Sequence, residues 1–143
     1  MHTTKNANGM PASYTLNSEA ILAFYLDEEG ANVVQDIFEQ VQAGEAEGNL
    51  SIITLTEICY ILSSVNLELA EQREKKLRLM GLKIVPIEDN GLWREAAHEK
   101  SIHSMSLADA FAVATAKAFK SKLVVGSDKE FSGTNVSLLR IRK

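Results

Sequence analysis

Short runs of Ile, Val and Leu recur along the chain, and longer stretches with a helical pattern separate them. A run that is apolar at nearly every position suits a strand buried on both faces better than one with a face in water. On this basis we expect strands at residues 14–17, 50–53, 83–87, 122–125 and 136–141.

The stretches between these runs carry apolar residues three and four positions apart, the spacing of one helix face. Such stripes occupy residues 33–41, 58–65, 92–97 and 107–118. Residues 67–80 are also helical by propensity, with a charged, solvated middle and a stop at Gly81. Strands alternating with helices predict an α/β fold, a three-layer α/β/α sandwich around a mostly parallel five-stranded sheet.

Length and composition indicate one soluble domain. A chain of 143 residues can bury a substantial core, and its prolines, at positions 11 and 86, mark no linker. We expect residues 1–12 to be a flexible N-terminal tail and residues 13–143 to be a single domain.

No apolar run approaches the roughly 20 residues that span a bilayer, so no membrane association is expected. The single cysteine, Cys59, cannot form an internal disulfide, which fits a cytoplasmic protein.

The net charge of −4 argues mildly against a nucleic-acid partner, because such proteins usually carry a basic excess. That objection weakens if many of the acids gather at one metal site, where bound cations would offset them.

Polar residues stand where the predicted strands end, and ligands of parallel sheets bind beyond the carboxyl ends of the strands. Asn17 ends the first strand, and Glu57 follows the second by one turn. Asp109 lies in the first turn of the helix that starts near Ser106, and Asp128 follows the fourth strand. Each acid also has an ordinary interpretation: residues 54–57 and 106–109 resemble capping boxes, and residues 127–128 resemble a turn.

Asp109 is the hardest of these acids to explain by local structure. It lies in a helix of small and apolar residues, which indicates a buried helix, and a carboxylate there is costly unless it is paired, hydrogen-bonded or bound to metal. A helix N-terminus offsets only about 0.3–1 kcal/mol of that cost. Hard divalent cations prefer oxygen ligands, so convergence of Glu57, Asp109 and Asp128 would suit phosphate-ester chemistry.

Four segments in order resemble the motifs of the PIN-domain family, which includes the VapC-like toxins of toxin–antitoxin pairs. They are residues 16–22 (Leu-Asn-Ser-Glu-Ala-Ile-Leu), 52–57 (Ile-Ile-Thr-Leu-Thr-Glu), 106–110 (Ser-Leu-Ala-Asp-Ala) and 123–131 (Leu-Val-Val-Gly-Ser-Asp-Lys-Glu-Phe). The resemblance covers nearly the whole chain, from Tyr14 to Arg142, and residues 106–110 are its most specific part.

This resemblance implies a PIN-like fold and a metal-dependent endoribonuclease, the toxin of a toxin–antitoxin pair. The implied catalytic positions are Asn17, Glu57, Asp109 and Asp128, with the three acids as ligands of Mg²⁺ or Mn²⁺. The implied partners are an RNA substrate, an antitoxin protein and a second copy of the chain in a homodimer.

Asn17 departs from the family pattern, which has Asp at this position. An amide can offer an oxygen but no charge, and a charge about 4 Å from a cation is worth about 4 kcal/mol at an effective dielectric constant of about 20. Glu19 could replace the charge if the first strand continues to position 19; otherwise it is a first-turn helix acid. The sequence therefore leaves open a catalytically impaired PIN-like module that binds RNA or protein, and, if the acids do not converge, an unrelated α/β domain.

Overall fold

The computed structural model describes residues 11–143; residues 1–10, most of the predicted tail, lie outside the described residues. Its strands are β1 (Ala12–Leu16), β2 (Ala46–Ser51), β3 (Lys83–Val85), β4 (Lys122–Val125) and β5 (Leu138–Arg140). Its helices are α1 (Ser18–Tyr25), α2 (Ala31–Gln42), α3 (Ile52–Ser63), α4 (Leu67–Leu79), α5 (Asn90–Ile102), α6 (Leu107–Phe119) and the 3₁₀ helix η1 (Lys129–Gly133).

The five strands form one sheet in the order β3-β2-β1-β4-β5, and every neighbouring pair is parallel. From β1 the chain first builds outward through β2 and β3, and then returns to the other side of β1 to add β4 and β5. The strand order therefore reverses between β1 and β4. In open parallel sheets, such a reversal creates a crevice at the carboxyl ends of the two strands.

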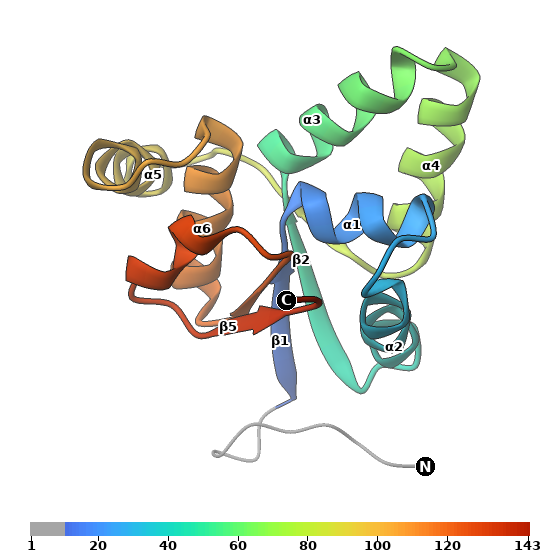
Figure 1. The fold of residues 1–143 in the computed structure, drawn as a ribbon, viewed down its shortest axis with the longest axis horizontal. Coiled ribbons are helices and arrows are strands. Elements are labelled where there is room, and N and C mark those ends of the chain that lie inside the picture. Colours follow the sequence, from blue (N-terminus) through green and yellow to red (C-terminus); the bar gives the residue numbers. More distant parts are fainter. Residues whose placement is uncertain (1–10) are drawn as a thin grey trace.

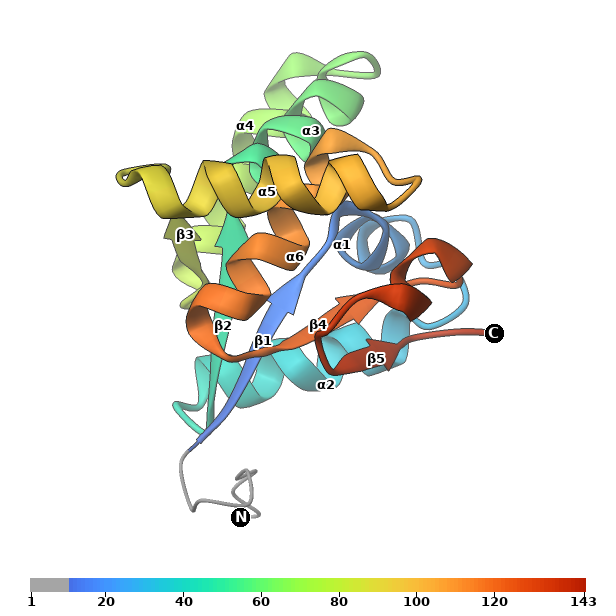
Figure 2. The ribbon, with the colours of Figure 1, turned by 90° about the vertical axis from the view of Figure 1, so that its left-hand side faces the viewer.

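Helices cover both faces of the sheet, as a three-layer α/β/α sandwich requires (Figures 1 and 2). Helices α5 and α6 lie on one face and helices α1 and α2 on the other. Helices α3 and α4 pack against each other and project past the carboxyl end of β2, beside α1 (Figure 1). The predicted fold class is confirmed.

Strand β4, on one side of the reversal, is buried on both faces from Leu123 to Val125, which explains its apolar sequence there. In β4, Leu123 and Val125 point into the core under α5 and α6, whereas Val124 points into the core on the other side. All three side chains are fully buried. This two-sided burial is the usual environment of a central parallel strand.

Strand β2 differs most from its prediction. It begins at Ala46, whose neighbours Glu47, Gly48 and Asn49 form no apolar run, and it pairs with β1 through backbone hydrogen bonds. The strand ends at Ser51, because the Ser51 side chain accepts a hydrogen bond from the Ile53 amide and starts α3 there. Residues 52–53 are therefore helical, and the predicted capping box at residues 54–57 is wrong.

Other boundaries follow from single residues. Strand β3 ends before Pro86, which lacks an amide proton for the ladder. Gly81 has a φ of 97° after α4, in the left-handed conformation expected of a helix stop. Strand β1 already begins at Ala12, the last residue of the predicted tail.

Among residues 11–143, none of the helices has the length and apolar character to cross a bilayer.

Candidate active site

Four segments that are distant in sequence meet at the crevice between β1 and β4. A cavity of about 270 Å³ opens there, at the carboxyl edge of the sheet. Its lining includes all four predicted site residues: Asn17, Glu57, Asp109, Asp128. The side chains of Ser18, Glu19, Ser106 and Phe131 complete it. The acids therefore converge, which an unrelated α/β domain with merely capped helices would not require.

Asn17 connects β1 to α1 and serves both elements. Its backbone amide donates to the Val124 carbonyl at 3.0 Å, and its side-chain oxygen accepts from the Ala20 amide at 2.9 Å as the N-cap of α1. The side chain also donates a hydrogen bond that helps to keep Asp109 ionised. Asn17 is only 3% exposed. Its side-chain oxygen is therefore used mainly to cap α1, and its amide group to donate to Asp109.

Glu57 reaches the cavity from the second turn of α3, because β2 passes directly into that helix. The buried hydroxyl of Ser18 donates a hydrogen bond to one carboxylate oxygen of Glu57. This contact joins the start of α1 to α3 and orients the Glu57 carboxylate. The small polar residue after Asn17 therefore has a structural role beside the acids.

Asp109 stands in the first turn of α6, as predicted, and Ser106 is the N-cap. The Asp109 amide donates to the Ser106 hydroxyl oxygen at 3.1 Å, so the capping interpretation of residues 106–109 holds for Ser106. The rest of α6 is a central buried helix whose residues from Ala110 to Ala116 are almost entirely inaccessible. Helix α6 thus carries Asp109 to the cavity from inside the core.

The environment of Asp109 opposes its negative charge. Burial is the main cause, and the nearby carboxylates of Glu57 and Asp128 add to it, so the pKa of Asp109 is raised to about 6. Hydrogen bonds from the side chains of Ser106 and Asn17 act in the opposite direction. A carboxyl group with a raised pKa among other acids is typical of sites that bind cations or transfer protons.

Asp128 follows β4 and is the exposed acid of the set. Its carboxylate accepts from the Glu130 amide at 2.9 Å and caps η1, so the turn interpretation also holds. Two contacts fix this loop: Phe131 is buried beneath it, and Arg140 of β5 donates to the Asp128 carbonyl at 2.7 Å. The support that Arg140 gives to Asp128 is not evident from the sequence.

Glu19 lines the same cavity, and of its two predicted placements the first-turn helix acid is the one observed. Strand β1 ends at Leu16, so Glu19 is a first-turn acid of α1 and not a continuation of the strand. Its carboxylate lies over Gly126 and pairs with Arg142, whose Nη2 is 3.3 Å from the Glu19 Oε1 atom. The pairing of Arg142 with Glu19 is likewise not evident from the sequence, because nothing in the local pattern links the C-terminal segment to α1.

The donor chemistry of the cavity fits a hard divalent cation, because the acidic side chains of Glu57, Asp109 and Asp128 line one space and burial there disfavours the charge of Asp109. The side chains do not form a ready-made ligand shell. Within residues 11–143, no three acidic, His or Cys side chains are gathered closely enough to hold one ion. Glu57 and Asp128 are instead turned toward protein donors, so side-chain rotation would have to accompany binding.

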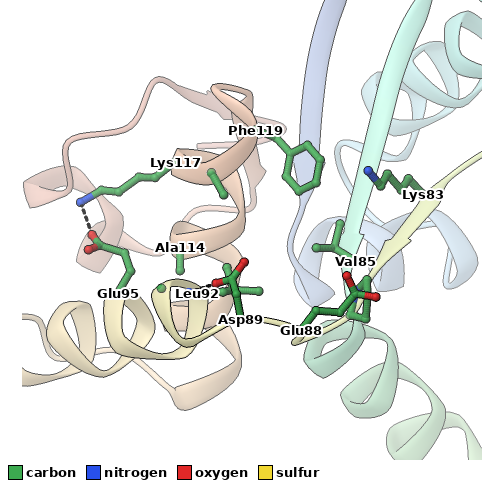
Figure 3. A pocket seen from close by; sticks show the side chains of 12 residues that line it. Lys83, Val85, Glu88, Asp89, Leu92, Glu95, Ala114, Lys117 and Phe119 are labelled. Atoms are coloured by element: carbon green, nitrogen blue, oxygen red, sulfur yellow. Dashed lines mark hydrogen bonds and ion pairs between the residues drawn. The ribbon is translucent and has the colours of Figure 1, made fainter.

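A larger cavity, of about 720 Å³, lies away from these residues, between β3, α5 and α6 (Figure 3). Its charged groups other than Glu88 already have protein partners. Lys117 donates to Glu95 at 2.8 Å, Lys83 lies 4.6 Å from the ring centroid of Phe119, and Asp89 caps α5. None of the four predicted site residues lines it. We therefore place the candidate active site in the smaller cavity at the carboxyl edge of the sheet.

Comparison with known proteins agrees with this architecture. The structure resembles VapBC2 from Rickettsia felis bound to a promoter DNA fragment, with a TM-score of 0.70, 18% identity, and coverage of 90% of this chain and 98% of that one. It also resembles a toxin–antitoxin complex from Klebsiella pneumoniae (TM-score 0.66, 17% identity, coverage 90% and 97%) and FitAcB from Neisseria gonorrhoeae (0.66, 18%, 90% and 97%). At these identities the likeness shows the fold alone.

No curated protein sequence matches the chain. A family model matches the chain: the PIN domain model aligns with residues 14–136, from β1 to the residues just before β5. The aligned region includes all four predicted site residues and most of the 143-residue chain. The chain therefore belongs to the PIN-domain family.

Proposed function

We propose that this protein is a metal-dependent endoribonuclease of the PIN type and acts as the toxin of a toxin–antitoxin pair in the cytoplasm. The observation that carries the proposal is the convergence of Asn17, Glu57, Asp109 and Asp128, from four separate segments, on one cavity at the strand-order reversal. Membership of the PIN-domain family and a fold like that of solved toxin–antitoxin proteins support it.

The residues of the cavity divide into ligands and supports. Glu57, Asp109 and Asp128 would hold Mg²⁺ or Mn²⁺, because their acidic side chains line this space from three separate segments and match the acidic positions of the PIN-domain family. The ion, when bound, would lower the pKa of a coordinated water and offset charge that develops on the phosphate. Ser18 orients Glu57, and Asn17 donates to the Asp109 carboxylate.

An antitoxin partner is supported by the surface next to the cavity. The hairpin of α3 and α4, which projects past the sheet, carries large apolar side chains that are mostly exposed to solvent. These are Tyr60 (74% exposed), Val65 (79%), Leu67 (65%) and Leu79 (83%). Three of them, Tyr60, Val65 and Leu67, lie within eight residues around the turn between the two helices, and exposed apolar patches usually mark interaction sites. We propose that this hairpin contacts the antitoxin and that the toxin itself is a homodimer.

The proposal is tested with single-stranded RNA and Mg²⁺ or Mn²⁺. The purified protein, the Asn17→Asp variant and the Asp109→Ala variant are compared for cleavage. Removing the Asp109 carboxylate is expected to lower the rate by at least about a hundredfold, because a charge at the centre of the site is lost. If neither the natural chain nor Asn17→Asp cleaves faster than Asp109→Ala, the nuclease proposal is wrong.

A second candidate is a PIN-like module that binds RNA or protein without useful catalysis. Two observations favour it: Asn17 brings no charge, and the acids are held by protein donors and not gathered for one ion. Cleavage by Asn17→Asp but not by the natural chain would favour this candidate. RNA binding that persists without added metal would then identify RNA as the ligand.

A further inference from the structure

Glu19 brings a fourth carboxylate to the cavity that contains Glu57, Asp109 and Asp128. Its side chain is 35% exposed, so it can reach both the cavity and solvent. Asn17, two residues earlier, borders the same cavity but has no charge to offer. The negative charge expected at position 17 is thus absent, while an extra one is present a short distance along the same helix start.

The Glu19 carboxylate lies against the backbone of Gly126, in the space that a side chain would fill; we call this position the seat of Glu19. Gly126 follows β4, and a Cβ atom at this position would collide with the carboxylate group of Glu19. The glycine therefore lets Glu19 lie flat against the end of β4, in the crevice between β1 and β4. The seat keeps Glu19 within the cavity and does not leave it free in solvent.

Arg142 is the resident counter-charge of Glu19. Its guanidinium lies 3.3 Å from Glu19 Oε1 and 3.5 Å from Glu28 Oε1, and it donates to the Glu29 carbonyl at 3.2 Å. Two carboxylates therefore share one arginine, but only Glu19 lines the cavity. If Glu19 turns toward a ligand in the cavity, Arg142 keeps its contacts with Glu28 and Glu29, so its own charge stays compensated.

We propose that Glu19 supplies to a bound divalent cation the negative charge that Asn17 lacks, and that Arg142 holds Glu19 until the cation binds. This inference rests on the proposed function. It assigns two residues of this chain, Glu19 as an additional ligand and Arg142 as its positioning residue. In this proposal Asn17 has a structural role, as the N-cap of α1 and as a hydrogen-bond donor to Asp109.

The test measures Mn²⁺ binding to the intact protein by electron paramagnetic resonance and isothermal titration, without substrate. Glu19→Gln is expected to weaken Mn²⁺ binding by about tenfold to a hundredfold, at least as much as the loss of an outer-shell partner. Glu28→Gln is the matched control: it removes the same charge from the same arginine outside the cavity. It is expected to change the affinity by about threefold or less, as for an exposed charge.

A charge-swap variant separates a ligand from a general electrostatic effect. In Asn17→Asp/Glu19→Gln the charge is returned to position 17, and Mn²⁺ affinity is expected to recover to that of the natural chain. Arg142→Gln is expected to strengthen Mn²⁺ binding, because Glu19 is released. This gain is expected to disappear when Glu19→Gln is also present. Thermal unfolding without metal confirms that each variant is folded.

The possible outcomes are distinct. Equal losses in Glu19→Gln and Glu28→Gln, or a gain in Arg142→Gln that persists with Glu19→Gln, would overturn the inference. If the natural chain binds Mn²⁺ and Glu19→Gln binds it equally well, the inference is also wrong but the proposed function stands. If the natural chain, Asn17→Asp and Arg142→Gln all fail to bind Mn²⁺, both are wrong.

Discussion

Two groups of acids lie on different sides of α6, and the protein treats their charges in opposite ways. The first group lies between α5 and α6, where Glu99 is 1% exposed. Lys117 of α6 donates to both Glu99 and Glu95, and His103 Nε2 lies 3.4 Å from the second oxygen of Glu99. The hydrogen bond with Lys117 lowers the pKa of Glu95, and the hydrogen bonds with Glu95 and Glu99 raise the pKa of Lys117, so the opposite charges stabilise each other.

The second group lies at the N-terminal end of α6, around Asp109. Here the neighbouring charges are the acids Glu57 and Asp128, and together with burial they raise the pKa of Asp109 to about 6. The cavity contains no lysine, and Arg142 contacts only its margin, at Glu19.

The difference separates a cluster in which opposite charges compensate each other from one in which like charges repel. The charge of a buried acid that pairs with a lysine is compensated, and removing the lysine leaves the cost of burying that charge uncompensated. An acid beside other acids is unsatisfied in the folded protein without a cation, so removing its charge relieves repulsion. A substitution that removes one charge should therefore lower stability at the C-terminal end of α6 and raise it at the N-terminal end.

The largest expected effect is at the paired cluster of Glu95, Glu99 and Lys117. Lys117→Met keeps the length and apolar stem of the side chain but leaves Glu99 buried without its cation. We expect the free energy of unfolding to fall by about 3 kcal/mol, as for a broken buried pair. Urea unfolding measures it, with the exposed Lys122→Met as control and an expected change of about 0.5 kcal/mol or less. A loss no larger than that of the control would show that the cluster does not stabilise the fold.

An effect of opposite sign is expected at the cavity. Asp109→Asn removes the charge that burial and the neighbouring acids oppose. In EDTA at pH 7 we expect the free energy of unfolding to rise by roughly 1–2 kcal/mol, allowing for the partial exposure of this group. A variant less stable than the natural chain at pH 7 would mean that the cavity is already satisfied without a cation.

The pH dependence of that gain gives a sharper test. The pKa of Asp109 is about 6 in the folded protein against an ordinary value of 3.8, so the folded state binds the proton more tightly. The natural chain therefore loses stability from this group as pH rises from about 4 to about 6. The advantage of Asp109→Asn should be near zero below this window and complete above it. Urea unfolding of both proteins across this range measures the difference, and an advantage that does not depend on pH would contradict the assignment.

The smallest effect on stability is expected at Gly126. In Gly126→Ala the new Cβ displaces the end of a flexible side chain, the Glu19 carboxylate, so the free energy of unfolding should change by less than about 1 kcal/mol. Mn²⁺ affinity should nevertheless fall by about tenfold if Glu19 needs its seat beside β4. The neighbouring exposed Ser127→Ala serves as control. Unchanged Mn²⁺ affinity would show that Glu19 binds from elsewhere or not at all.

Sequence patterns predicted the parts of the fold in which burial dictates residue type. The strand at residues 122–125 was predicted with its observed bounds, because β4 is buried on both faces and must be apolar. The first half of β2, residues 46–49, was missed because its place depends on backbone hydrogen bonds to β1, which leave no apolar signature. The start of α3 was predicted too late, because Ser51 caps that helix while still ending the strand.

By itself, the sequence determined the α/β class, the family motifs and the acids that stand near strand ends, because these depend on local spacing and on the cost of burying charge. Only the tertiary structure decided that the acids share one cavity, that Ser18 holds Glu57, and that Gly126 and Arg142 hold Glu19. These contacts join segments from opposite ends of the chain, and such proximity is created by the order of the strands and not by any local pattern.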